Sequence, residues 1–359
     1  MSIGRLPLRK RIGLEIERRL QNDVIREHPL QQLFWESTLR CNLSCRHCGS
    51  DCHVSAVHPD MPLADFLGVL DRIAQRYNPN EVFVIISGGE PLMRPDLEQC
   101  GRAIYERGFP WGMVTNGLAL TPRRFEALLQ AGLHSMSVSL DGLEENHNWM
   151  RGNAQSFSKA SQAIDLLVGE PSVAYDVITC VTEHNYEELP RLRDFLIAKG
   201  VRDWRLLTVV PMGRAAADAE LGLTDAHFRG LMEFIKTTRR EGSIRAEYGC
   251  EGYLGAYEFD VRDHAFVCSA GVTIGSVLID GSISACTSIR SDYHQGNIYQ
   301  DDFIDVWEHR FAAYRTDEWK RTGVCASCNA FRYCRGNGMH LRRGDGSLMV
   351  CHLKRLEAE

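Results

Sequence analysis

Between about residues 34 and 240, the chain alternates short apolar runs with longer stretches of helical periodicity. A strand-length run followed by an amphipathic helix, repeated along the chain, favours parallel strands with helices packed outside them. Six such units fall short of the eight that close a full barrel. The alternation therefore predicts an α/β fold whose core is a partial (β/α)6 barrel of the TIM type. The expected strands are 33–37, 81–87, 111–115, 135–140, 174–181 and 204–210, and the expected helices are 63–77, 96–107, 122–131, 158–168 and 189–199.

Residues with functional chemistry follow these apolar runs, at the end where each expected strand stops. In barrels of parallel strands, active groups lie at the carboxyl ends of the strands. We therefore expect one site there, built from a cysteine loop after residue 37, Gly88-Gly89-Glu90-Pro91, Asn116-Gly117, Asp141-Gly142 and Pro211-Met212-Gly213-Arg214.

The cysteine loop carries Cys41, Cys45 and Cys48, at spacings of four and three residues. A [4Fe–4S] cluster takes one cysteine per iron, so four cysteines would saturate it. Three leave one iron with an open position, as in a catalytic zinc site, and such an iron can bind and reduce a small molecule. A zinc knuckle or a chance cluster is the alternative. Cys52, close by, is either a neighbour that contacts substrate or cluster, or an inert thiol.

Together with Ser87-Gly88-Gly89-Glu90-Pro91, this CxxxCxxC pattern resembles the radical S-adenosylmethionine (SAM) enzymes. The resemblance implies that the three cysteines hold a SAM-binding [4Fe–4S] cluster. It also implies one-electron cleavage of SAM to methionine and a 5′-deoxyadenosyl radical, which abstracts hydrogen from a substrate. The electron donor expected for such an enzyme is a reduced flavodoxin or ferredoxin.

The same resemblance assigns SAM-binding roles. Gly88 and Gly89 let the backbone approach a ligand closely, and their segment would hold the amino group of SAM. Arg151 could pair with the SAM carboxylate in a forked geometry, or could instead form an ordinary salt bridge. His47 stands where the family carries a bulky aromatic near the adenine. The full predicted set is His47, Gly88, Gly89, Glu90, Pro91, Asn116, Ser139, Asp141 and Arg151.

After about residue 250, cysteines recur in a second pattern. Cys268-x12-Gly281-x4-Cys286 is followed by Cys325-x2-Cys328-x5-Cys334 and then by Cys351. This arrangement resembles the SPASM extension of radical SAM enzymes, which carries seven cysteines. The resemblance implies at least one auxiliary [4Fe–4S] cluster. Its outer cluster would be held by Cys325, Cys328, Cys334 and Cys351.

One position departs from the SPASM pattern, because Gly338 stands where the seventh cysteine is expected. The inner auxiliary cluster, which would use Cys268 and Cys286, is then absent or completed by an unusual group such as Cys250. A twitch-type extension with a single cluster on Cys268, Cys286, Cys325 and Cys328 is a further alternative. Zinc at the C-x2-C-x5-C run is another.

Length and charge fit this organisation. The 359 residues suffice for a large domain and a smaller one, which we expect as an amphipathic segment at 1–33, a barrel at 34–245 and the iron–sulfur extension at 246–359. A net charge of −6 gives no argument for nucleic acid or anionic membrane as a partner. No apolar run is long enough to span a bilayer. Thirteen cysteines without an apolar signal core favour a cytoplasmic redox protein over a disulfide scaffold.

Proteins that resemble radical SAM/SPASM enzymes mostly modify peptides and proteins made by ribosomes. Our first hypothesis is therefore an oxidoreductase or maturase that acts on a peptide or protein. Thr287 stands where sulfatase maturases place an aspartate, which disfavours that branch. A tetrapyrrole-modifying enzyme of haem biosynthesis is the alternative from the same chemistry. A non-catalytic metal-binding or electron-carrier protein is the alternative from another class, and it would bind metal without cleaving SAM.

Overall fold

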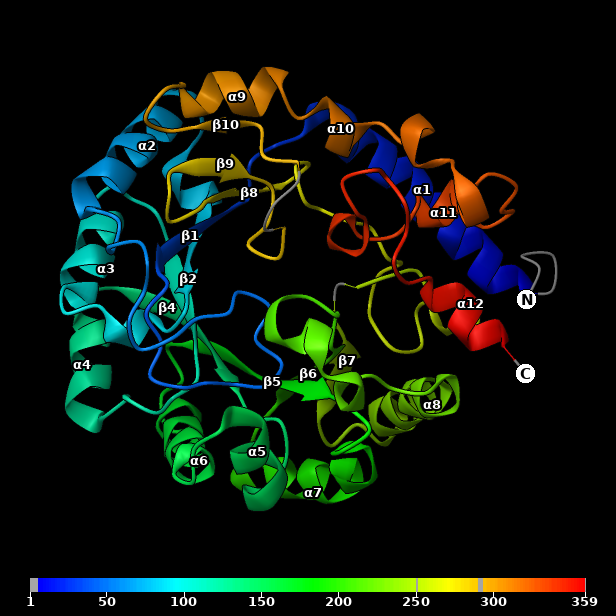
Figure 1. The fold of residues 1–359 in the computed structure, drawn as a ribbon, viewed down its shortest axis with the longest axis horizontal. Coiled ribbons are helices and arrows are strands. Elements are labelled where there is room, and N and C mark those ends of the chain that lie inside the picture. Colours follow the sequence, from blue (N-terminus) through cyan, green and yellow to red (C-terminus); the bar gives the residue numbers. More distant parts are fainter. Residues whose placement is uncertain (1–5, 250, 290–292, 359) are drawn as a thin grey trace.

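The structure, a computed structural model, describes residues 6–249, 251–289 and 293–358. Its centre is one ten-stranded sheet, curled into an open barrel with helices around the outside (Figure 1). The strands follow the order β10-β9-β8-β1-β2-β3-β4-β5-β6-β7. They are β1 (Gln32–Thr38), β2 (Phe83–Gly88), β3 (Trp111–Thr115), β4 (Leu133–Ser139), β5 (Ala174–Val181), β6 (Asp203–Thr208), β7 (Arg245–Tyr248), β8 (Ile274–Val277), β9 (Ser282–Ser284) and β10 (Gly296–Asn297).

Strands β1 to β7 pair in parallel, each with the next along the chain. Connections between parallel strands need a crossover, and here helices supply it on the outside of the sheet. Those of the barrel are α2 (Leu63–Arg76), α3 (Leu97–Tyr105), α4 (Pro122–Gln130), α5 (Glu144–Arg151), α6 (Ser156–Val168), α7 (Leu189–Lys199) and α8 (Asp225–Glu241).

Local sequence explains where several helices begin and end. The side chain of Thr121 caps α4 by accepting from the N–H of Arg124, and Pro122 follows at the first helical position. Thr224 caps α8 in the same way, and Gly242 ends that helix in the left-handed conformation. Their apolar faces pack against the strands, and the ring of Trp35 in β1 stacks on Phe66 of α2 with 4.3 Å between centroids.

The cysteine-rich tail continues the barrel sheet. Strand β8 pairs in parallel with β1, from Gln32 opposite Ile274 to Trp35 opposite Val277, and β9 and β10 follow as antiparallel strands. Around them lie α9 (Phe303–His309), α10 (Ala312–Arg315), α11 (Phe331–Cys334) and α12 (His352–Glu357). With the N-terminal helix α1 (Leu8–Glu27), these elements occupy the arc between α2 and α8 in Figure 1. Tail and barrel therefore share one sheet.

Helix α1 lies within the amphipathic segment expected at 1–33, of which residues 1–5 lie outside the described residues. Its Leu14 is buried, whereas a row of apolar side chains on its outer side is exposed, namely Leu8, Ile12, Ile16, Leu20 and Val24. Among the described residues, no helix combines the length and apolar character needed to cross a bilayer.

The six predicted strands and five predicted helices are all present, with ends shifted by a few residues. The second strand starts at Phe83 and not at residue 81, because Pro79–Glu81 form a 3-10 turn capped by the Asn78 side chain. Helices α5 and α8 and strand β7 were not predicted. Strand β7 has the sequence Arg-Ala-Glu-Tyr, which lacks the apolar run that marks a buried strand.

Candidate active site

The loop after β1 brings Cys41, Cys45 and Cys48 to the wall of one pocket of about 240 Å³. Cys41 and Cys45 are buried, and the N–H of Cys41 donates to the carbonyl of His53 (2.7 Å). Cys52 lines the same pocket, where its hydrogen bond to Cys48 lowers the pKa of the Cys48 thiol to about 5. Four thiols therefore gather at the carboxyl end of the first strand.

Most of the residues predicted to bind SAM face this pocket. The lining includes His47, Gly88, Gly89, Glu90, Asn116, Ser139 and Arg151. Pro91 and Asp141 are buried and do not line it; Pro91 follows Glu90 in the chain, and Asp141 pairs with Arg151. The amide of Asn116 donates to Asn42 (2.8 Å) and approaches the Cys41 sulfur at 3.9 Å. The structure thus brings the strand-end motifs together at one place.

Gly88 and Gly89 follow β2 and pass directly against the backbone of the cysteine segment. The N–H of Gly89 donates to the carbonyl of Thr38 (2.7 Å), and that of Glu90 donates to the carbonyl of Arg40 (2.9 Å). A Cβ on Gly88 would overlap the Thr38 carbonyl, and one on Gly89 would overlap that of Arg40. Gly88 also has φ of 136°, which side-chain-bearing residues rarely adopt. Glycine is required at both positions.

Replacing Gly88 by alanine should lower the free energy of unfolding by at least about 1–3 kcal/mol from the backbone conformation alone, with more from the overlap with Thr38. Gly68→Ala in α2 is the matched control, since nothing lies within 4 Å of its Cβ position, and it should stabilise by about 0.5–1 kcal/mol. Denaturant unfolding of the anaerobically purified variants measures both. Equal stability of the two variants would contradict this assignment.

The side chain of Glu90 forms hydrogen bonds with neighbouring groups of the protein. Its carboxylate accepts from the Thr115 hydroxyl (2.7 Å) and from the N–H groups of Asn116 (2.7 Å) and Leu92 (3.1 Å). Burial raises the pKa of this carboxyl, and these hydrogen bonds act against the rise. Through these hydrogen bonds, Glu90 links the turn after β2 to the end of β3.

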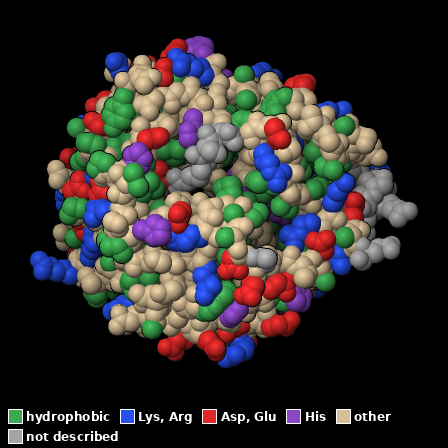
Figure 2. Space-filling model, viewed as in Figure 1, with side chains coloured by type: hydrophobic (Ala, Val, Ile, Leu, Met, Phe, Trp, Pro, Cys, Tyr) green, Lys and Arg blue, Asp and Glu red, His purple; other side chains and the backbone are tan. Residues whose placement is uncertain are grey.

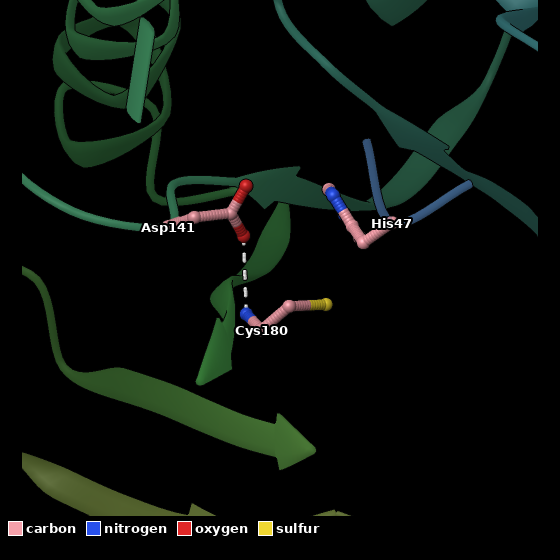
Figure 3. Close-up of side chains that lie close together, drawn as sticks. All are labelled: His47, Asp141 and Cys180. Atoms are coloured by element: carbon pink, nitrogen blue, oxygen red, sulfur yellow. Dashed lines mark hydrogen bonds between the residues drawn. The ribbon is translucent and has the colours of Figure 1, made fainter. Parts of the chain in front are cut away.

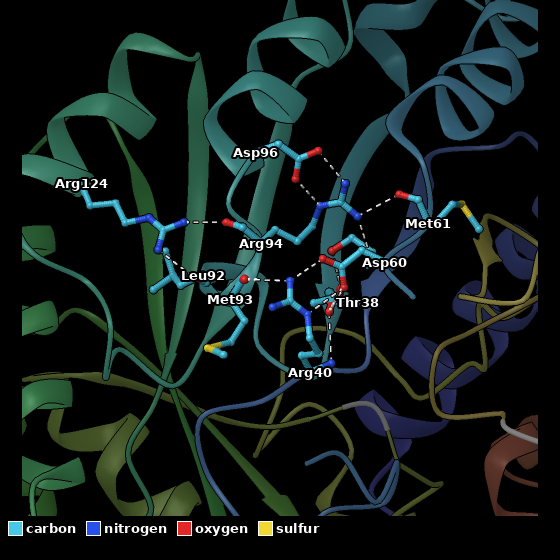
Figure 4. A network of polar contacts seen from close by, with 11 residues as sticks. Thr38, Arg40, Asp60, Met61, Leu92, Met93, Arg94, Asp96 and Arg124 are labelled. Carbon is cyan, nitrogen blue, oxygen red and sulfur yellow. Dashed lines mark hydrogen bonds and ion pairs between the residues drawn. The ribbon is translucent and has the colours of Figure 1, made fainter. Parts of the chain in front are cut away.

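Arginines fix the same turn from outside (Figure 4). Arg124 donates to the carbonyl oxygens of Leu92 (2.6 Å) and Arg94 (3.0 Å), and Arg40 donates to that of Met93 (3.0 Å). Each of these three successive carbonyls would otherwise need water or a strand partner. The turn is therefore held rigidly beside the cysteine loop.

Asp141 and Arg151 form a buried ion pair against the cysteine loop, with Nε and Oδ2 2.7 Å apart. The Arg151 guanidinium also approaches the Cys45 sulfur at 3.8 Å. Burial raises the pKa of Asp141, but Arg151 together with the nearby His47 and His147 outweighs it, and the pKa falls to about 2. The salt bridge that the sequence left as an alternative for Arg151 is therefore present, and it is buried.

His47, Asp141 and Cys180 converge from three segments (Figure 3), with a possible ligand atom of each within 4.8 Å of the others. The N–H of Cys180 donates to Asp141 (3.0 Å). Burial lowers the pKa of His47 to about 4 and raises that of the Cys180 thiol. Within this group, the carboxylate of Asp141 is already paired with Arg151. The buried Nδ1 of His47 has no hydrogen-bond partner among the described residues.

Cys180 is a thiol that the sequence analysis did not assign to the site. It ends β5 and lines a second, larger cavity beside His47. Its place at a strand end was the signal that could have identified it.

Arg214 belongs to a predicted strand-end motif, and it donates to the carbonyls of Cys45 (2.8 Å) and Cys52 (3.0 Å). It fastens the cysteine loop to the segment after β6.

The larger cavity measures about 540 Å³ and connects the barrel to the tail. Its lining reaches from His47 and Cys180 on the barrel side to Cys268 and Cys286 on the tail side. The surface on the face drawn in Figure 2 is hollowed near its centre, with hydrophobic side chains around the hollow. The volume falls in the range of about 300–1,000 Å³ that small-molecule sites occupy. Further lining residues are Phe34, Arg205, Leu207, Thr208, Val209, Val210, Glu251, Ile274, Ile289 and His340.

The last four cysteines lie close together, away from this cavity. Burial raises the pKa of Cys351, and the neighbouring Cys325 and Cys328 thiols raise it further. Burial likewise raises the pKa of Cys334 to about 12, with Cys351 and Cys325 adding to the rise. This grouping favours one site on Cys325, Cys328, Cys334 and Cys351. Cys250, named from the sequence as a possible ligand, lies outside the described residues.

Comparison with known proteins places these features in a family. The Radical SAM superfamily matches residues 35–196, and the SPASM iron-sulfur cluster-binding domain matches residues 268–329. An AdoMet-dependent heme synthase of Methanosarcina barkeri is 26% identical over 84% of this chain and 89% of its own length. A mycofactocin maturase of Mycolicibacterium smegmatis is 27% identical over 86% of this chain and 77% of its own length.

The solved structure of anSMEcpe with bound AdoMet and a peptide has the same fold, with a TM-score of 0.72 over 92% of this chain and 95% of that one, at 18% identity. The chain is a radical SAM enzyme with a C-terminal SPASM region. Its cofactors are SAM and [4Fe–4S] clusters, at least one of which is auxiliary. The residues present fit them, because thiols share one pocket, and His47 offers a buried nitrogen without a partner among the described residues.

Proposed function

We propose that Cys41, Cys45 and Cys48 hold the SAM-binding cluster in the smaller pocket. When bound, this cluster supplies the electron that cleaves SAM to methionine and a 5′-deoxyadenosyl radical, which takes hydrogen from a substrate C–H bond. Three protein thiols leave one iron position open for the ligand. The electron would come from a reduced flavodoxin or ferredoxin.

The protein groups around the pocket would orient SAM. Gly88 and Gly89 would let the main chain approach the methionine end, and Asn116 and Ser139 would offer polar contacts from the next strand ends. Arg151, held by Asp141, places a fixed positive charge beside Cys45, where it suits a carboxylate. The neutral His47 ring, which lines both pockets, would stack against the adenine at the boundary with the larger cavity.

The substrate that we propose is a tetrapyrrole. The observation that carries this proposal is the similarity to an AdoMet-dependent heme synthase, which extends over barrel and tail alike. The cavity between His47 and Cys268 supports it, because apolar walls suit a flat macrocycle. Arg205 is the one arginine or lysine among the described residues of that lining; its guanidinium pairs with Asp176 (2.6 Å) and would have to exchange that carboxylate for a propionate group.

Anaerobic incubation with SAM, a chemical reductant and an iron porphyrin bearing propionate groups tests the proposal. We expect the porphyrin to increase 5′-deoxyadenosine formation at least about tenfold, and its absorption spectrum to change on binding. Arg205→Leu should weaken binding, whereas the exposed Arg72→Leu on α2 should not. Basal SAM cleavage without any response to the porphyrin would refute the tetrapyrrole while leaving the radical chemistry intact.

A peptide is the second candidate, and it was the first hypothesis from the sequence. The 27% identity to a mycofactocin maturase, over 86% of the chain, favours it. Stimulation of 5′-deoxyadenosine formation by a precursor peptide encoded beside the gene, with deuterium transfer from a labelled residue, would select this candidate. The barrel expected at 34–245 and the extension expected at 246–359 would share the substrate cavity in either case.

A further inference from the structure

Gly338 stands where the SPASM pattern has its seventh cysteine, and the space next to it is filled by a histidine. A Cβ built on Gly338 would lie 2.7 Å from Cε1 and 2.9 Å from Nδ1 of His340, and 3.0 Å from the carbonyl oxygen of Glu251. The imidazole of His340 therefore takes up the volume that a side chain at position 338 would need. A cysteine side chain at position 338 would clash with His340 in its present position.

His340 shares its surroundings with the two inner cysteines. Cys268, Cys286 and His340 all line the larger cavity. The N–H of Met339, next to His340, donates to the Cys268 sulfur (3.5 Å). Burial raises the pKa of Tyr314, and both Cys268 and Cys286 raise it further, so both thiols lie near that ring.

The His340 ring is in a state that suits ligation. A histidine ring nitrogen that carries no proton offers a lone pair to a metal. Within the described part of the chain, neither ring nitrogen takes part in a hydrogen bond, and the partly buried ring faces the cavity.

We propose that His340 supplies the protein ligand that Gly338 cannot, and that the inner auxiliary cluster is held by Cys268, Cys286 and His340. Neutral imidazole replaces thiolate in known iron–sulfur centres and raises their reduction potential, because it removes one negative charge. The inner cluster of this chain should then be a better electron acceptor than one with three thiolates. It faces the cavity in which a substrate would lie, so it could take an electron from a substrate radical. The proposal does not depend on which substrate is used.

The test uses protein with Cys41, Cys45 and Cys48 changed to alanine, purified anaerobically, so that only auxiliary clusters remain. Histidine labelled with ¹⁵N in this protein should change the nitrogen coupling that pulsed EPR detects on the reduced clusters. His340→Cys should keep the iron and sulfide content, lose the nitrogen coupling and lower the reduction potential. His340→Ala should lose about four irons per chain. His309→Ala, an exposed histidine on α9, is the matched control and should change none of these values.

Absence of a histidine nitrogen coupling, or an unchanged iron content in His340→Ala, would overturn the proposal. Loss of the same irons in Cys250→Ala, with His340→Ala unaffected, would overturn it in favour of Cys250. His340→Cys replaces one metal-ligating side chain by another. If this variant retains its iron while His340→Ala loses it, the loss results from the missing ligand and not from a folding defect. None of these readouts requires SAM cleavage, so a failure here is distinguishable from a failure of the proposed function.

Discussion

With Cys41, Cys45 and Cys48 replaced by alanine, the protein is expected to form no 5′-deoxyadenosine from SAM and still to contain about eight irons per chain. The first result follows because all three thiols of the smaller pocket are gone. The second follows because Cys325, Cys328, Cys334 and Cys351 form a separate group, and Cys268 and Cys286 lie at the far side of the larger cavity. Iron and sulfide analysis and chromatography of the nucleoside product measure both.

Cys100→Ala is the matched control for this experiment. Cys100 is fully buried in α3, away from both pockets, so the variant should keep SAM cleavage and all of its iron. If the triple variant retained only about four irons, the inner cluster would be absent and the ligation by His340 would be wrong. If it retained none, and zinc were found instead, the tail cysteines would form a structural zinc site.

Replacing Asp141 by asparagine should lower the free energy of unfolding by about 3–5 kcal/mol, because it leaves the buried Arg151 guanidinium without its counter-charge. SAM binding should also weaken, since Arg151 loses the partner that fixes it beside Cys45. Denaturant unfolding and equilibrium binding of SAM measure the two effects. A variant that also carries Arg151→Leu should recover part of the stability without recovering SAM binding, because it removes the uncompensated charge.

The pair Asp71 and Arg107 gives the control. It has the same charges and a similar distance (2.8 Å), but Asp71 is more than half exposed. Asp71→Asn should change the free energy of unfolding by less than about 1 kcal/mol. If Asp141→Asn and Asp71→Asn changed the free energy of unfolding equally, the Asp141–Arg151 ion pair would not have the stabilising role expected of a buried pair.

The Asp141 pair also gives stability a definite acid dependence. The pKa of the Asp141 carboxyl is lowered from the usual 3.8 to about 2 in the folded protein. A carboxyl with a lowered folded-state pKa contributes stability above its unfolded pKa and loses it as the pH falls through the folded one. The contribution of this pair is therefore complete above about pH 4 and is lost towards pH 2. Asp141→Asn should show less of this acid-side loss.

The sequence predicted the barrel well because buried parallel strands are continuous apolar runs that composition makes visible. It missed β7 and β9, which are short and carry polar residues, and it did not foresee that β8 joins the barrel sheet beside β1. That pairing joins residues more than 200 positions apart, and no local pattern reports such a contact.

For the site, the spacing of the cysteines and the residues at the strand ends predicted the pocket, because these residues lie in short stretches of the sequence. The partners of those residues could not be predicted. Cys180 looks like any thiol in an apolar run until folding places it beside Asp141 and His47. In the same way, the sequence showed that Gly338 interrupts the cysteine pattern, but only the three-dimensional structure shows the His340 ring in the space beside it.

The pairing of β8 with β1 has a consequence for how the enzyme can be divided. Strand β1 carries the fully buried Leu33 and Trp35, and it lies between β2 and β8. A barrel cut off before the tail would present the whole side of β1 as an open edge, with unpaired N–H and C=O groups that can recruit another chain. The cysteine-rich tail therefore protects the catalytic barrel from aggregation, and exchanging it between relatives requires a β8 that matches β1.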